Sequence, residues 1–206
     1  MTLHPENDLL LTDDQAACDR AQVIVDAARL FEPDPDFERS VKFSAKGIDY
    51  NRFLLGLDGR NLTVGDINQV CQTLAMPTNL RQQAGEAFES PSTVLLGFEH
   101  RSGEVIYKLY FEFWDQVVSQ VHGEVDPHAP VLLNLGFKWN VDVPDRQVVT
   151  RYTCLPLLDL NRILARITKI TDDTVRGACR DIVTRSAHKL ARPTFVYMEA
   201  EEGNDV

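Results

Sequence analysis

The chain has 206 residues, of which 44% are hydrophobic, and a formal net charge of −10. This content is enough for one sizeable core, and the ordinary charged fraction argues against extensive disorder. No apolar run reaches the roughly 18 residues that a membrane helix needs. The residues from Met1 to Asp14 show no secretory signal, so we expect a cytoplasmic protein.

The negative charge bears on the choice of partner. Bare nucleic acid is a poor partner because its phosphates would be repelled, whereas a basic peptide or a basic protein face is a better one. Acidity that serves only solubility is the open alternative.

The first part of the chain has mostly helical periodicity. Apolar residues from Gln15 to Phe31 predict an amphipathic helix, Ser40–Lys46 a short strand and Ile48–Leu57 a short helix. Thr63 and Thr78 are suited to begin two further helices.

The period then changes to alternation, which is typical of strands. Val94–Glu99 and Glu104–Trp114 predict one hairpin, and Val131–Trp139 with Gln147–Leu155 predicts a second. We expect both hairpins to form one antiparallel sheet.

The last part of the chain predicts two more helices. One carries Leu160 and Ile167, and the other starts at Asp172 or Asp173. A last strand at Thr194–Met198 is expected.

Together these elements predict a single α+β domain over residues 1–206. Three helices followed by a hairpin give residues 47–114 the order of a winged-helix or peptide-recognition module. Residues 115–198 would hold the second hairpin and the C-terminal helices, and residues 199–206 a frayed acidic tail. Peptide-binding versions of such modules add a ligand strand to a sheet edge, and the acidity favours that use over DNA binding.

Motifs for catalysis or metal binding are mostly missing from the sequence. It contains neither of the common nucleotide-binding loops, no H-E-x-x-H and no G-x-S-x-G. His122 and His128, with Glu124 and Asp126 between them, could suit a metal, but a solvated loop explains them as well. We therefore predict no catalytic residue, no metal site and no cofactor in this chain.

The cysteines are widely spaced, at Cys18, Cys71, Cys154 and Cys179. Reduced thiols that pack as small hydrophobes are the simplest interpretation, and a redox pair made by folding stays open. Cys154 follows Arg151-Tyr152-Thr153, so a thiol with a lowered pKa is conceivable there, although a packed strand cysteine fits better.

Large aromatic and cationic side chains are concentrated in the first hairpin. By alternation, half of the run from Tyr107 to Trp114 belongs to a core. The other half lies on a face that is not simply polar, where Tyr110 and Trp114, together with Ile106, would be covered by helices or by a partner.

Several short segments resemble the partner proteins of methanobactin biosynthesis, the MbnC family. The resemblance runs from about Val41 to Ile167, and its segments are Val41-Lys42-Phe43, Asp49-Tyr50-Asn51-Arg52-Phe53, Asp66-Ile67-Asn68 with Cys71 and Met76-Pro77, Gly97-Phe98-Glu99, the run from Tyr107 to Trp114, Gly136-Phe137-Lys138-Trp139 and Thr150-Arg151-Tyr152-Thr153.

The resemblance implies a heterodimer with an iron-containing TIM-barrel oxidase. The pair would convert cysteines of a ribosomal precursor peptide into oxazolone and thioamide groups, which chelate copper. The iron would belong to the barrel subunit, and this chain would hold the basic leader of the precursor, partly by strand addition. No catalytic residue is carried over to this sequence.

The leading hypothesis is therefore a non-catalytic peptide-binding subunit. Acidic strand residues could attract a basic leader, although ordinary solvated charge explains each of them individually. The residues expected to contact peptide or partner are Glu99, Tyr110, Glu112, Trp114, Asp115, Lys138, Trp139, Arg151 and Tyr152.

Two alternatives come from other classes of protein. A small aromatic prenyltransferase could bind an allyl diphosphate through Lys108, Lys138 and Arg151, although about four long strands fall short of its ten-stranded barrel. A winged-helix transcription factor lacks the expected basic face.

Overall fold

The computed structural model describes residues 10–32, 34–44, 47–123, 126, 128–189 and 196–203. Contacts divide the chain into two compact units. Unit 1 consists of Met1–Trp114, Asn134–Arg151 and Glu201–Val206, and unit 2 consists of Asp115–Leu133 and Tyr152–Ala200. The expected single domain stays a prediction.

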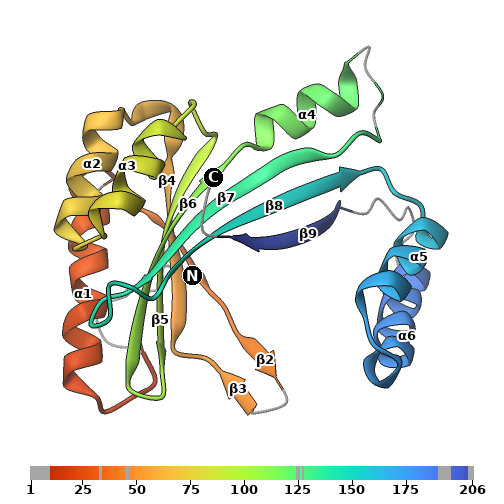
Figure 1. The fold of residues 1–206 in the computed structure, drawn as a ribbon, viewed down its shortest axis with the longest axis horizontal. Helices are drawn as coiled ribbons and strands as arrows, with labels where there is room; N and C mark the ends of the chain where they lie inside the picture. Colours follow the sequence, from red (N-terminus) through yellow and green to blue (C-terminus); the bar gives the residue numbers. More distant parts are fainter. Residues whose placement is uncertain are drawn as a thin grey trace. The chain divides into compact units, whose positions relative to one another are not determined.

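Seven strands of the described chain form one sheet, in the order β1-β4-β5-β6-β7-β8-β9 (Figure 1). The pairs from β1 to β7 are antiparallel, and the α+β class predicted from the sequence is confirmed. The strands of the sheet are β1 (Asp36–Arg39), β4 (Arg52–Asp58), β5 (Thr93–Arg101), β6 (Glu104–Glu112), β7 (Val131–Asn140), β8 (Gln147–Pro156) and β9 (Val196–Gly203). A separate small pair is formed by β2 (Lys42–Ser44) and β3 (Gly47–Asp49).

One face of the sheet in unit 1 carries the main core. Phe53, Phe98, Tyr107 and Trp139 are register partners across four strands, and all four are buried. Their neighbouring ring centroids lie 5.4 to 6.2 Å apart. Large aromatic side chains contribute most to a core because each buries a large apolar area.

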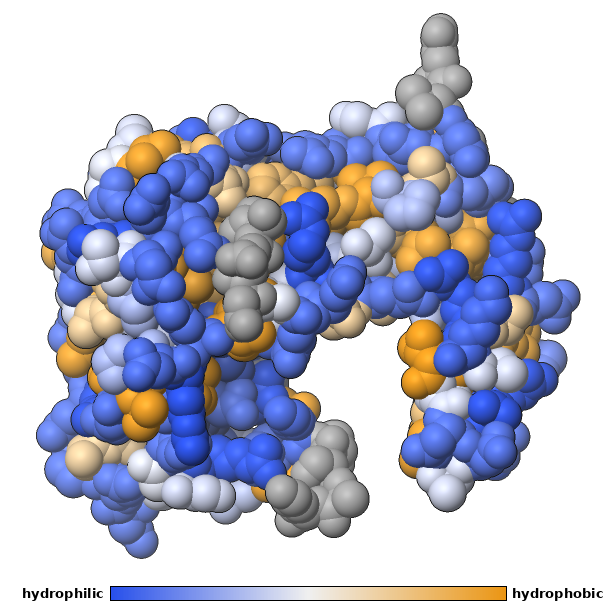
Figure 2. Space-filling view, viewed as in Figure 1, coloured by the Kyte–Doolittle hydropathy of each residue, from blue (hydrophilic) through white to orange (hydrophobic). Residues whose placement is uncertain are grey.

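Three helices pack on this face: α1 (Gln15–Arg29), α2 (Val64–Thr73) and α3 (Thr78–Glu86) (Figure 1). Ala17, Ala21 and Ala28 are buried along α1, and their small side chains let the helix lie close to its neighbours. The outer surface of these helices is largely hydrophilic in this view (Figure 2). Exposed hydrophobic residues on them include Val23 on α1 and Val64 on α2.

Local hydrogen bonds fix where the helices begin and how they meet the sheet. The Asp14 carboxylate accepts from the Ala17 N–H at 3.1 Å, and Thr63 forms a capping box with Asp66 at the start of α2. The Tyr107 hydroxyl donates to the Arg20 carbonyl at 2.9 Å, which ties α1 to β6.

The segment Ile48–Leu57, predicted as a short helix, is extended instead and forms the end of β3 and most of β4. Its apolar residues fit both periods, but Phe53, Leu55 and Leu57 alternate, and all three are buried on the helix-covered face. The first of the three helices predicted in the winged-helix order of residues 47–114 is therefore a strand. A 3₁₀ turn, η1 (Gly59–Asn61), separates β4 from α2.

The first predicted hairpin is confirmed, but its turn is tighter than expected. The strands β5 and β6 pair as far as Arg101 and Glu104, so the loop consists of Ser102 and Gly103 alone. Both residues have positive φ, at 52° and 78°. Such a two-residue turn matches the twist of the flanking strands.

Unit 2 has two small clusters of buried residues. One consists of Val117, Leu133 and Cys154, with Val117 supplied by α4 (Trp114–His122). The other consists of Leu155, Leu158, Ile163 and Ile167 and involves α5 (Leu160–Ile170). Hydrophobic side chains also reach the surface of α5 and of α6 (Asp173–Lys189), among them Ile170 and Ile182 (Figure 2).

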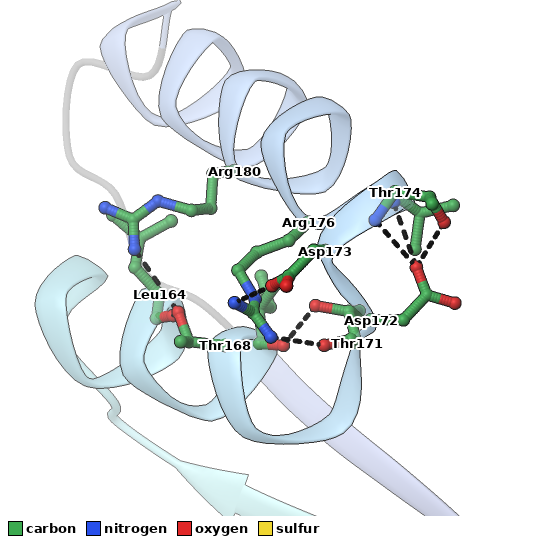
Figure 3. Close-up of polar contacts among 10 residues, drawn as sticks. Leu164, Thr168, Thr171, Asp172, Asp173, Thr174, Arg176 and Arg180 are labelled. Atoms are coloured by element: carbon green, nitrogen blue, oxygen red, sulfur yellow. Dashed lines mark hydrogen bonds and ion pairs between the residues drawn. The ribbon is translucent and has the colours of Figure 1, made fainter.

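The junction between α5 and α6 is held by side-chain caps (Figure 3). The Asp172 carboxylate accepts from the N–H groups of Thr174 at 2.9 Å and Val175 at 3.2 Å, so α6 begins where the sequence predicted. Arg176 donates to the Thr171 carbonyl at 2.8 Å, and Arg180 donates to the Thr168 hydroxyl at 3.3 Å.

The acidic end of the chain is strand rather than the frayed tail expected from residue 199 onward. β9 begins at Val196 and continues to Gly203. The rest of the predicted tail, residues 204–206, lies outside the described residues. Within the described part, no helix combines the length and apolar character needed to cross a membrane.

Candidate functional site

The face of the sheet opposite α1–α3 carries polar and charged side chains in unit 1. Alternation places Arg52, Glu99 and Asn140 in one cross-strand row. The adjacent row contains Gly97, Lys108 and Lys138. We call this surface the polar face and define it by these two rows.

A buried ion pair lies at the centre of the polar face. The Lys108 ammonium donates to the Glu99 carboxylate, and the Arg52 guanidinium lies 3.7 Å from the same carboxylate oxygen. The side chains of Lys108 and Glu99 are only 5% and 12% exposed. Two charges at such depth persist because each compensates the other.

The two pKa values show how burial and pairing compete. Burial lowers the pKa of Lys108 to about 8, although the nearby Glu99 opposes the shift. Burial by itself would raise the pKa of Glu99, but attraction to Lys108 and Arg52 outweighs it and leaves that pKa below its usual value. Glu99 is therefore ionised at neutral pH, while Lys108 begins to lose its proton in mildly alkaline solution.

Gly97 provides the space that this arrangement needs. A Cβ atom at Gly97 would lie 2.9 Å from Leu54 Cδ2 and 3.0 Å from Lys108 Cβ. Real side chains do not approach so closely without moving, so the glycine lets Leu54 and Lys108 close over the strand.

Two further predicted site residues lie on the same side of β6. Tyr110 and Glu112 alternate with the buried Leu109 and Phe111 and are partly buried. Burial raises the pKa of Glu112, and the nearby Glu38 carboxylate raises it further. The structure thus brings Glu99, Tyr110, Glu112 and Lys138 onto one side of the sheet.

An acidic strand forms one margin of the sheet. β9 is the last strand in the sheet order and carries Glu199, Glu201 and Glu202. Glu199 is paired with Arg166 through two hydrogen bonds of 2.5 and 2.6 Å, whereas Glu201 is exposed. Glu202 contacts the Lys138 ammonium at 3.4 Å, within unit 1.

The remaining predicted residues lie elsewhere. Trp139 is on the helix-covered face, is 1% exposed and donates from Nε1 to the Leu74 carbonyl at 3.2 Å, so it belongs to the core. Trp114 was expected on the sheet, but it is the first residue of α4 and is 40% exposed, followed by Asp115. Arg151 is exposed and Tyr152 is half-buried in β8.

Sequence reasoning missed three residues of this region. Arg52 was hidden by the helix expected at Ile48–Leu57, and Glu201 and Glu202 by the expected frayed tail. Only once the segment is known to be a strand does the alternation of Phe53, Leu55 and Leu57 place Arg52 on the polar face. Nothing in the run Glu199–Glu202 signals a strand.

The remaining candidates for chemistry are metal-binding side chains and thiols. In the described part of the chain, no group of three or more histidine, cysteine or acidic side chains is arranged to hold a metal. Of the loop residues His122, Glu124, Asp126 and His128, which could suit a metal or be a solvated loop, Glu124 lies outside the described residues. Cys154 is buried, and burial raises its thiol pKa, so it is the packed strand cysteine rather than an activated thiol. Cys71 is buried too, and burial raises its pKa to about 12.

No protein-family model, curated protein or solved structure matches the chain in the comparisons.

Proposed function

We propose that the chain is a non-catalytic subunit that binds a basic peptide segment as an added strand. The observation that carries this proposal is the acidic strand β9 at the margin of the seven-stranded sheet. A margin strand offers backbone N–H and C=O groups to an incoming strand, and its glutamates favour a positively charged one.

The peptide that we propose is the leader of a cysteine-containing ribosomal precursor, and the partner is an iron-containing TIM-barrel oxidase. This finer part rests on the resemblance of short segments to the MbnC family. In that arrangement the oxidase would form the copper-chelating oxazolone and thioamide groups, and this chain would position the substrate. Iron would be held by the partner.

The prenyltransferase alternative is not supported by the charges on the polar face. Lys108 contacts Glu99 and Lys138 contacts Glu202, so two of the cations assigned to a diphosphate are already next to carboxylates. A diphosphate placed there would meet those negative charges.

The binding half of the proposal is tested by nuclear magnetic resonance on the full chain. We would titrate it with an extended peptide rich in lysine and arginine, and with a charge-reversed peptide of the same length. We expect the basic peptide to perturb amides of β9 and the reversed peptide to leave them unchanged. Perturbations confined to other elements would contradict strand addition at β9.

A double variant tests the role of charge. E201Q/E202Q should weaken binding about 2- to 30-fold, because exposed ion pairs contribute roughly 0.2–1 kcal/mol each. The matched control D13N/E89Q removes the same charge from exposed positions in unit 1 outside the sheet and should leave the affinity unchanged. Equal losses in both variants would indicate only a general effect of net charge.

The proposed partnership with an oxidase is tested by co-expressing this chain with a TIM-barrel protein encoded by an adjacent gene and with a short cysteine-bearing peptide. We expect a stable complex that contains iron and shifts the mass of the peptide. Turnover of any substrate by this chain alone, without metal, would contradict the assigned role.

A further inference from the structure

The helix α6 is poorly covered by the rest of the described chain. Ala187 is the one fully buried residue among its 17, whereas α1 buries six of its 15 residues. A helix in a folded protein owes most of its stability to the packing of an apolar face. The side of α6 that carries exposed apolar residues is therefore available to a partner.

That exposed side of α6 combines apolar and positively charged residues. Val175 and Ile182 lie seven residues apart, which places them on the same side of the helix, and Ile182 is 65% exposed. The ion pair between Arg185 and Asp181 is itself exposed, so it does little to occupy the guanidinium. We call this side the cationic face and define it by Val175, Ala178, Ile182, Arg185 and Lys189, all of which are exposed.

α1 has an exposed side of the same spacing and the opposite charge. Val23 lies seven residues before Leu30, the residue that ends α1, and Leu30 is 63% exposed. Gln15 donates to Asp19 at 2.7 Å and Gln22 donates to Asp26 at 2.8 Å, but neutral amides leave both negative charges in place. We call this side the acidic face and define it by Ala16, Asp19, Val23, Asp26 and Leu30, all of which are exposed.

The two faces match residue for residue when the helices are aligned in parallel. With Val23 placed against Ile182, Asp26 comes opposite Arg185. The acidic face carries a charge of −2 and the cationic face a charge of +2. Positions seven residues apart are those through which paired helices pack, and charges of opposite sign beside them favour that pairing.

We propose that α6 of one copy of this chain packs on α1 of a second copy. A twofold dimer forms this contact twice, because each chain supplies one cationic face and one acidic face. A single contact between two short helices is small against the roughly 1,200–2,000 Å² that specific interfaces bury, so the repetition matters and the dimer is weak. The net charge of −10 on each copy opposes association, but physiological salt screens charges that lie more than about 8 Å apart.

The experiment measures the oligomeric state of the full chain by sedimentation velocity, over a series of concentrations at physiological salt. We expect a reversible equilibrium between monomer and dimer, with a dissociation constant in the micromolar range. A monomer at every concentration would overturn the proposal. Assembly beyond the dimer would overturn the twofold arrangement.

Charge reversal tests which faces meet. D26R and R185D should each weaken the dimer about 2- to 30-fold, because each variant places like charges opposite one another in both contacts. An equimolar mixture of the two variants should dimerise like the native chain, since every contact in the mixed dimer again pairs opposite charges. A structural defect or a general effect of net charge would not be repaired by mixing, so failure of the mixture to recover would overturn the pairing of α1 with α6.

The apolar part of the contact has its own variants. I182E should weaken the dimer at least about tenfold, because it places a carboxylate between apolar side chains. V118E is the matched control, since Val118 is an exposed valine of α4 outside both faces. Equal losses in I182E and V118E would exclude α6 as the contact. Neither face includes β9, so the peptide titration decides the proposed function independently of this result.

Discussion

Lys108 and Glu99 form a buried ion pair on the side of the sheet opposite α1–α3, above a glycine that leaves room for it. Replacing Lys108 by methionine would leave a carboxylate with only 12% of its side chain exposed and with Arg52 at 3.7 Å. We expect K108M to lower the free energy of unfolding by less than the roughly 3–5 kcal/mol seen when a buried charge loses its only partner, because Arg52 still lies near the carboxylate. A loss of about 1–3 kcal/mol is the expected range. Denaturant titration measures the change.

The matched control for that prediction is the double variant K108M/E99Q. It removes both charges, so it should recover most of the lost stability, because replacing a whole buried pair is often neutral. A double variant that is less stable than K108M would show that the charges act separately.

The low pKa of Lys108 predicts a pH dependence of stability. The folded chain loses this proton near pH 8, whereas the ordinary lysine pKa of 10.5 applies to the unfolded chain. Between these values the unfolded state binds more protons, so the contribution of Lys108 to the free energy of unfolding rises with pH. Below pH 8 both states are protonated, and the penalty for burying the charge is fully present.

Other groups have the opposite sign and require a difference measurement. Burial raises the pKa of Cys71 and of Tyr107 to about 12, and it also raises the pKa of Cys154 and of Tyr197, so their contributions fall as alkaline pH rises. These effects cancel when the native chain is compared with K108M/E99Q. We expect the native chain to gain stability relative to that variant from pH 8 to pH 10, and a flat difference would contradict the assigned shift.

Glycine substitutions provide a test of packing around the pair. G97A would push a methyl group against Leu54 and Lys108, and we expect a loss of about 1–3 kcal/mol of unfolding free energy. G85A on α3 is the control in the same unit, because its Cβ would lie at ordinary distances of 3.9 and 4.0 Å from Asn68 and Val64 on α2. It should stabilise the helix by up to about 1 kcal/mol. If G97A and G85A change the free energy of unfolding in the same direction, the close packing of Leu54 and Lys108 around Gly97 is contradicted.

The two tryptophans should differ in their fluorescence. W114F keeps only the buried Trp139, so its emission should be blue-shifted and poorly quenched by acrylamide. W139F keeps only the exposed Trp114, and should also lose about 1–3 kcal/mol because the Leu74 carbonyl is left without its N–H donor. Comparable quenching of both single-tryptophan variants would contradict the different burial of the two residues.

The hairpins show what alternation can predict. The run from Val105 to Phe111 separates cleanly into two faces, and both the strand and its partner followed from the sequence. Ile48–Leu57 could not be resolved in the same way, because its apolar residues fit a helix and a strand equally well and the sheet decides between them. Trp114 marks a similar limit, since the alternation continues through Phe113 and Trp114 and does not reveal that the strand ends at Glu112.

The candidate site was less accessible from the sequence than the fold. Because side chains alternate along a strand, Lys138 and Trp139 must lie on opposite faces of the sheet. The alternation alone does not tell which of the two faces the helices cover. β9 depends on pairing with β8, because a glutamate-rich run has low intrinsic strand preference.

The burial of two thiols gives each unit its own built-in reporter. Cys71 lies in the core of unit 1 and Cys154 in a cluster of unit 2, so neither can react with a maleimide until its surroundings open. Pulsed labelling followed by mass spectrometry would then give one opening rate for each unit in an unmodified chain. Equal rates would mean that the units open cooperatively, and unequal rates would rank their local stabilities.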